Sequence, residues 1–186
     1  MNLVRLPSNN CYLPGQMTEN QVFALVYHGT ASPDVFSAIG WLRNPKSEVS
    51  SNYVISKAGV TYELVNPLVG RRSWANGKVH PNYDKSIKWL VDCVKREINP
   101  NWHTISIEHE ATSKEMADQA RMTDAQFNAS IDLSAWLMRQ FNLKAGHEQM
   151  LAHRQIAADW KPTCPGVIFV PAYAEVLIAR NPDLKP

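Results

Sequence analysis

The sequence predicts a single α/β domain in which helices flank a central mixed β-sheet. Short apolar runs that are typical of strands alternate along the chain with segments of helical periodicity. Two of the β-rich runs are close enough to form a hairpin, which requires an antiparallel pair within the sheet. The length of 186 residues is enough to build one hydrophobic core. We therefore expect one domain over residues 1–186, with its core at about 20–180 and an irregular arm at 1–19.

Composition and charge exclude several functional classes. The net charge is only +2, and no basic run is interleaved with aromatic residues, so we expect no nucleic-acid partner. No stretch approaches the ~20 apolar residues of a membrane-spanning helix, so we expect no membrane insertion. The N-terminus lacks the basic segment and apolar core of a signal peptide. These features predict a protein that is cytoplasmic as synthesised. We also expect a monomer.

The first predicted elements are a buried strand and a short helix. The apolar run 22–27 predicts the strand, which ends at His28. Ser32 and Pro33 then have the character of an N-cap and a first helical residue. The helix that they begin has an apolar face made of Val35, Ile39 and Leu42.

A hairpin, a loop and a second helix follow. The runs 51–56 and 60–65 flank a turn that contains glycine, which predicts the hairpin. Residues 70–80 are typical of a loop. The segment 81–97 predicts a helix with one apolar stripe, formed by Tyr83, Ile87, Leu90, Val91, Val94 and Ile98.

The remaining elements complete the α/β pattern. Residues 104–110 alternate as a half-buried strand does. Thr123 and Gln126 have the spacing of a capping box that begins a helix ending near Asn142. Residues 172–179 predict a closing helix.

Two histidines stand at predicted strand ends, where open sites are usually built. His28 follows the first strand, and His153 follows a candidate strand at 149–152. With Cys164 they make a three-ligand set of the kind that catalytic zinc uses. The residues alone also allow Cys164 to act as a nucleophile with one histidine as its base. The other two cysteines, Cys11 and Cys93, do not indicate a disulfide framework, and their pairing stays open.

Three further residues are candidates for catalysis. Glu108 shares a strand face with Ser106, so it is either a catalytic carboxylate or a solvent-facing one. Lys161 is either a surface lysine or a cation placed beside an oxyanion near Cys164. Tyr53 lies in a strand, where its ring belongs to the core unless its phenol reaches the site.

Five motifs in a fixed order resemble a known family. They are His28 after an apolar strand, Ser51-Asn52-Tyr53-Val54-Ile55, Trp74-Ala75-Asn76-Gly77, Thr104-Ile105-Ser106-Ile107-Glu108, and His153-Arg154-Gln155 followed by Lys161 and Cys164-Pro165-Gly166. As an ordered set over roughly residues 20–170, they resemble the zinc-dependent N-acetylmuramoyl-L-alanine amidases of the type-2 amidase family. That family includes phage endolysins and peptidoglycan recognition proteins.

The resemblance implies a Zn²⁺ cofactor held by His28, His153 and Cys164. It also implies that Glu108 is the general base, that Tyr53 lies near the zinc, and that Lys161 stabilises the transition state.

Trp74 and Asn76 are similar to residues that border the glycan–peptide groove. Two features depart from the family pattern: Lys161 precedes Cys164 by three residues instead of two, and the helix at 81–98 separates motifs that are often closer together.

The function implied is that of a single-domain peptidoglycan hydrolase. It would cleave the amide bond between the lactyl group of N-acetylmuramic acid and the L-alanine of the stem peptide. A phage or prophage endolysin, released to the cell wall at lysis, and a muropeptide-recycling enzyme both fit. The alternatives are a non-catalytic peptidoglycan-binding module and a cysteine-dependent cell-wall hydrolase that uses Cys164.

Overall fold

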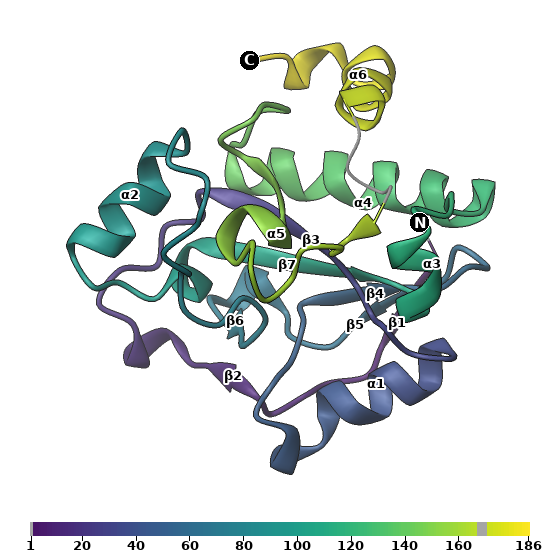
Figure 1. The fold of residues 1–186 in the computed structure, drawn as a ribbon, viewed down its shortest axis with the longest axis horizontal. Coiled ribbons are helices and arrows are strands. Elements are labelled where there is room, and N and C mark those ends of the chain that lie inside the picture. Colours follow the sequence, from purple (N-terminus) through teal and green to yellow (C-terminus); the bar gives the residue numbers. More distant parts are fainter. Residues whose placement is uncertain (1, 167–170) are drawn as a thin grey trace.

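The computed structural model describes residues 2–166 and 171–186, and it contains a six-stranded mixed sheet with helices on both faces (Figure 1). The strand order is β1-β5-β4-β7-β3-β8, and β2 and β6 form a small separate sheet. The predicted α/β class is confirmed. The strands are β1 (Leu3–Arg5), β2 (Cys11–Tyr12), β3 (Ala24–Gly29), β4 (Tyr53–Ile55), β5 (Thr61–Glu63), β6 (Arg72–Ser73), β7 (Thr104–His109) and β8 (Met150–Ala152). The helices are α1 (Val35–Arg43), α2 (Lys88–Lys95), α3 (Ser113–Ala117), α4 (Asp124–Phe141), α5 (His153–Ile156) and α6 (Pro171–Arg180).

Four neighbouring strands, β4, β7, β3 and β8, run parallel. Their carboxyl ends therefore lie along one edge of the sheet. The predicted hairpin is present as the antiparallel pair of β4 and β5. His28 lies opposite Glu108 in the β3–β7 register, and β8 ends one residue before His153. This topology places both candidate histidines at the carboxyl ends of neighbouring strands, as the sequence predicts.

The two faces of the sheet are covered by different helices (Figure 1). Leu25 and Ile107 belong to the core beneath α4 and α6. Val26, on the opposite face, packs with Leu90 of α2, and Val54 packs beneath α1. Because both faces are covered, β7 is buried almost throughout, whereas its alternating sequence predicted a half-exposed strand.

The expectation of an irregular N-terminal arm is wrong, because this part of the chain contains the two short strands β1 and β2. Leu3–Arg5 forms β1 and pairs in parallel with β5, which makes it an edge strand of the main sheet. Three residues are too few to display a hydrophobic period. Their extended conformation comes from pairing with the backbone N–H and C=O groups along the edge of β5.

The predicted helix at 81–97 is shorter than expected, because α2 begins only at Lys88. The segment before it forms turns of its own and also bonds to α5. The backbone N–H of Asp84 donates to the Gln155 carbonyl, and the Gln155 amide donates to the Asp84 carboxylate at 3.0 Å. These contacts with a distant part of the chain replace the first helical turns.

The first helix begins two residues later than Ser32 and Pro33 predict. Asp34 is the N-cap of α1, and its Oδ1 accepts from the backbone N–H groups of Phe36 and Ser37, both at 2.9 Å. A carboxylate at this position also interacts favourably with the helix dipole.

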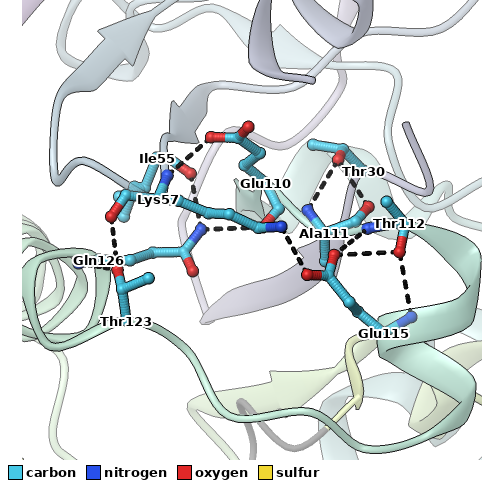
Figure 2. A network of polar contacts seen from close by, with 9 residues as sticks. All are labelled: Thr30, Ile55, Lys57, Glu110, Ala111, Thr112, Glu115, Thr123 and Gln126. Atoms are coloured by element: carbon cyan, nitrogen blue, oxygen red, sulfur yellow. Dashed lines mark hydrogen bonds and ion pairs between the residues drawn. The ribbon is translucent and has the colours of Figure 1, made fainter. Parts of the chain in front are cut away.

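The long helix α4 begins and ends as predicted, but the capping box is only half formed. Thr123 caps the helix by accepting from the N–H of Gln126. The Gln126 side chain does not return to Thr123. Its amide instead donates to the carbonyls of Ile55 and Glu110, at 3.0 and 3.1 Å, which joins α4 to the ends of β4 and β7 (Figure 2).

The same network ties α3 to the hairpin (Figure 2). Lys57 forms an ion pair with Glu115 at 2.5 Å, and Glu115 also accepts from the backbone N–H of Thr112. Thr112 Oγ1 in turn accepts from the backbone N–H of Glu115, which completes a capping box.

Two further predicted elements are present in the structure. The strand at 149–152 is present as β8 and the closing helix as α6. The segment 153–166 begins with the short helix α5. Cys11 and Cys93 are not paired. Among the described residues, no helix has the length and apolar character needed to cross a bilayer.

Candidate metal centre and active-site cleft

The structure brings the three predicted metal ligands together. The Nδ1 atoms of His28 and His153 lie 3.0 Å apart, and the possible ligand atoms of these two residues and Cys164 all lie within 4.8 Å of one another. His28 comes from β3, His153 begins α5, and Cys164 lies in the turns that follow. Two imidazole nitrogens and one sulfur form a donor set that suits zinc.

Both histidines are neutral and buried. Burial, followed by the charge of His153, holds the pKa of His28 well below its usual value, and burial lowers the pKa of His153 to about 4. Nε2 of His153 lies 3.3 Å from the carbonyl oxygen of Asn76, which can only accept, so Nε2 carries the proton. The lone pair of His153 is therefore on Nδ1. This atom faces His28, and it is the atom through which His153 would bind a metal.

Cys164 is buried beside the histidines. The backbone N–H of Gly29 donates to its Sγ at 3.5 Å. Burial, followed by the charge of Glu108, raises the pKa of the Cys164 thiol to about 12. A thiol of this kind is a poor nucleophile near neutral pH, and a cation is needed to stabilise its thiolate. Its surroundings favour a metal ligand over a cysteine nucleophile.

Glu108 reaches the same group of residues from β7. It lies opposite His28 in the register of the parallel strands, so the two side chains project from the same face of the sheet. Its Oε2 is buried and has no hydrogen-bond partner among the described residues. Burial raises the pKa of the carboxyl to about 7, against the opposing charge of Lys161. A carboxylate with this pKa is suited to take up and release protons near neutral pH.

A cleft of about 380 Å³ opens over these residues. His28, Glu108, His153, Lys161 and Cys164 all line it. Lys161 is exposed at the rim, and its charge lowers the pKa of each of the other four groups. The extra residue between Lys161 and Cys164 therefore does not keep the lysine away from the cleft.

Comparison with known proteins places this arrangement in a family. A family model described as N-acetylmuramoyl-L-alanine amidase matches residues 18–167. The chain belongs to this amidase family. Among curated proteins, none matches it.

Several solved structures share the amidase fold at low sequence identity. The chain is similar to an AmpD derivative, with a TM-score of 0.64, 20% identity, and coverage of 95% of this chain and 94% of that one. It is similar to PlyL, with a TM-score of 0.64, 15% identity, and coverage of 95% and 97%. It is also similar to the N-acetylmuramoyl-L-alanine amidase LysC from Clostridium intestinale URNW, with a TM-score of 0.56, 18% identity, and coverage of 96% and 95%.

Two residues expected at the amidase site lie elsewhere. Tyr53 is fully buried in the core beneath α4, on the face of the sheet opposite to Glu108. Trp74 packs its ring edge-on against Tyr12, with ring centroids 5.9 Å apart, and it is outside the set of described residues that line the cleft. The side-chain direction within a strand decides the position of Tyr53, because neighbouring residues point to opposite faces.

Asn76 is close to the amidase site but is only 3% exposed, so it has little surface to offer a substrate. Its contacts are with the protein. Its carbonyl accepts from His153, and its Nδ2 donates to Thr104 Oγ1 at 2.7 Å.

Two tryptophans of the cleft were not predicted from the sequence. Trp41 of α1 and Trp160 both line it, and they are 58% and 65% exposed. Trp160 is held by an edge-on contact with His80, with ring centroids 4.9 Å apart. The signal in the sequence was Trp160, an aromatic residue in the polar stretch between His153 and Cys164. Large apolar groups that are exposed near a site often contact ligands.

Proposed function

We propose that this amidase-family protein is a zinc hydrolase of peptidoglycan. It would cleave the amide between the lactyl group of N-acetylmuramic acid and L-alanine. The observation that carries the proposal is the convergence of His28, His153 and Cys164 with the unpartnered carboxylate of Glu108 in one cleft. Family membership supports the choice of peptidoglycan as the substrate.

The residues present fit the metal that the fold family implies. His28, His153 and Cys164 would hold Zn²⁺ through two nitrogens and a sulfur, and three protein ligands leave a position for water or substrate. Bound zinc would supply Lewis-acid chemistry, lowering the pKa of water to about 7 and polarising the scissile carbonyl.

Glu108 and Lys161 have separate roles in this proposal. The Glu108 carboxylate takes a proton from water as the water oxygen bonds to the lactyl carbonyl carbon. The ammonium group of Lys161 stabilises the negative charge that develops on the carbonyl oxygen. Glu108 then gives its proton to the alanine nitrogen as the carbon–nitrogen bond breaks, which leaves a carboxylic acid and a free amine.

The exposed tryptophans supply the surface for the substrate. Trp41 and Trp160 line the cleft with large rings that have polar edges. Such amphipathic rings are favourable contacts for ligands that are only partly apolar, and sugar rings are of this kind. We assign them to the glycan or the lactyl–peptide junction.

The decisive experiment is mass analysis of the products released from purified peptidoglycan. Free stem peptides that begin with L-alanine are expected. The glycan strands should stay uncut, so no new reducing ends should form. Release of disaccharides, or of peptides cut within the stem, would contradict the proposed bond. Binding to peptidoglycan with no released product would instead indicate a recognition module.

A further inference from the structure

Asn76 lies behind both metal-binding histidines. Its main-chain carbonyl faces Nε2 of His153 at 3.3 Å. Its side chain lies close enough to His28 to raise the pKa of that imidazole, although the larger effect of burial lowers it. Asn76, in the loop between β6 and α2, therefore lies beside both candidate ligands: His28 at the end of β3 and His153 after β8.

The orientation of the Asn76 amide follows from its neighbours. The hydroxyl of Thr104 donates to the carbonyl of Pro100 at 3.1 Å, so its oxygen is left to accept from Asn76. Nδ2 of Asn76 supplies that hydrogen bond at 2.7 Å. Oδ1 is therefore the atom that points away from Thr104. Backbone hydrogen bonds from Ala75 and Asn76 to the Asn101 side chain fix the loop itself.

Two buried polar atoms, one on this amide and one on His28, have no hydrogen-bond partner among the described residues. They are Oδ1 of Asn76, which is an acceptor, and Nε2 of His28, which is a donor in one tautomer. A buried polar atom without a partner is costly, and a hydrogen bond between these two atoms would satisfy both if His28 carries its proton on Nε2.

We propose that Asn76 is a positioning residue for the metal centre, presenting its carbonyl oxygen to His153 and its Oδ1 to His28. Both histidines are then held as Nε2–H tautomers, and both Nδ1 lone pairs face each other at 3.0 Å. Two lone pairs at this distance repel unless a cation lies beside them. The inference rests on the proposed metal site, and it replaces the expectation that Asn76 binds substrate.

The test measures zinc affinity rather than hydrolysis. Purified protein competes for Zn²⁺ with a chromophoric chelator, for the parent, Asn76→Ala, Asn76→Asp and the control Asn128→Ala. Asn128 is an exposed asparagine on α4 that donates no group to the site. Loss of a group that orients a ligand typically weakens metal binding about 10–100-fold, and this is expected for Asn76→Ala. Asn76→Asp retains the acceptor and should bind zinc within a few-fold of the parent.

A second measurement needs no variant. Nitrogen chemical shifts of the zinc-loaded parent should show Nε2 protonated and Nδ1 metal-bound in both His28 and His153. Coordination of His28 through Nε2 overturns the proposal. So does an Asn76→Ala protein that binds zinc as tightly as the parent, or one whose only defect is a raised KM. Absence of hydrolysis would instead count against the proposed function and leave this result unaffected.

Discussion

Nδ1 of His28 and Nδ1 of His153 lie 3.0 Å apart, although 125 positions separate the two residues in the chain. The parallel pairing of β3 with β8 produces this meeting, because it aligns the carboxyl ends of both strands. Each ring is neutral and buried, so each offers a lone pair in place of a positive charge. The sheet therefore brings together two side chains that are suited to bind a metal ion.

Removal of the metal is expected to abolish hydrolysis and lower thermal stability. Zinc that binds the folded chain alone, at a free concentration 100-fold above its Kd, stabilises it by about 2.7 kcal/mol. For a chain of this size, that corresponds to a shift in Tm of about 5–10 °C. Thermal melts with chelator and with added Zn²⁺ measure it. Cys164→Ser should lose most of the shift, whereas Cys93→Ala, a buried cysteine on α2, should keep it. Activity that survives chelation and is lost to a thiol reagent would favour a cysteine hydrolase.

Replacement of the general base should separate catalysis from metal binding. Glu108→Gln keeps the shape of the side chain but cannot accept a proton, and loss of a general base typically costs about 10²–10⁴-fold in rate. Turnover on purified peptidoglycan should fall by this factor, while zinc affinity stays near that of the parent. If the variant digests cell walls at the parental rate, Glu108 has another role.

The pH profile should report the electrostatic coupling of Lys161 to Glu108. Burial raises the pKa of Glu108 to about 7, and Lys161 opposes this shift. Because only the ionised carboxylate accepts a proton, kcat/KM should rise with pH until Glu108 is ionised, and bound zinc should place this midpoint at or below 7. Lys161→Met removes the opposing charge, so the midpoint should move to higher pH and the limiting rate should fall. A midpoint that moves to lower pH would contradict the assignment.

The cleft tryptophans should affect substrate binding more than turnover. Trp160→Ala removes a side chain that is 65% exposed, so little folding stability is lost. We expect KM for peptidoglycan fragments to rise roughly tenfold, which is about 1.4 kcal/mol of binding free energy, with kcat changed less. Phe36→Ala is the matched control, since Phe36 is equally exposed on α1 but lies outside the described lining of the cleft. Equal kinetics for the two variants would remove Trp160 from the substrate site.

The ion pair between α3 and the hairpin predicts a loss of stability in acid (Figure 2). Hydrogen bonds from Lys57 and from the Thr112 backbone hold the pKa of Glu115 at about 2, below its usual 4.5. Its stabilising contribution is present above pH 4.5 and is lost as the pH falls toward 2. Glu115→Gln should melt below the parent at pH 6, by at most about 1 kcal/mol for so exposed a pair, and the two should converge near pH 2. Glu175→Gln, an exposed glutamate on α6, should show no such convergence.

Local patterns predicted the elements better than their boundaries. Hydrophobic periodicity located α4 and the β4–β5 hairpin, because each carries its own signal in sequence. The start of α2 was missed because Gln155 competes for the backbone of Asp84. The Gln126 side chain was misassigned because it satisfies carbonyls of two strands that are distant in sequence.

The sequence by itself determined the α/β class, the three candidate ligands and the acidic residue beside them, since these depend on residue type and on order along the chain. Tertiary structure decided which side chains share the cleft. In the folded protein Tyr53 lies in the core and Asn76 is buried behind the histidines. Trp41 and Trp160 line the cleft. The physical reason is that strand pairing and side-chain direction bring distant residues together, and no local spacing encodes either of them.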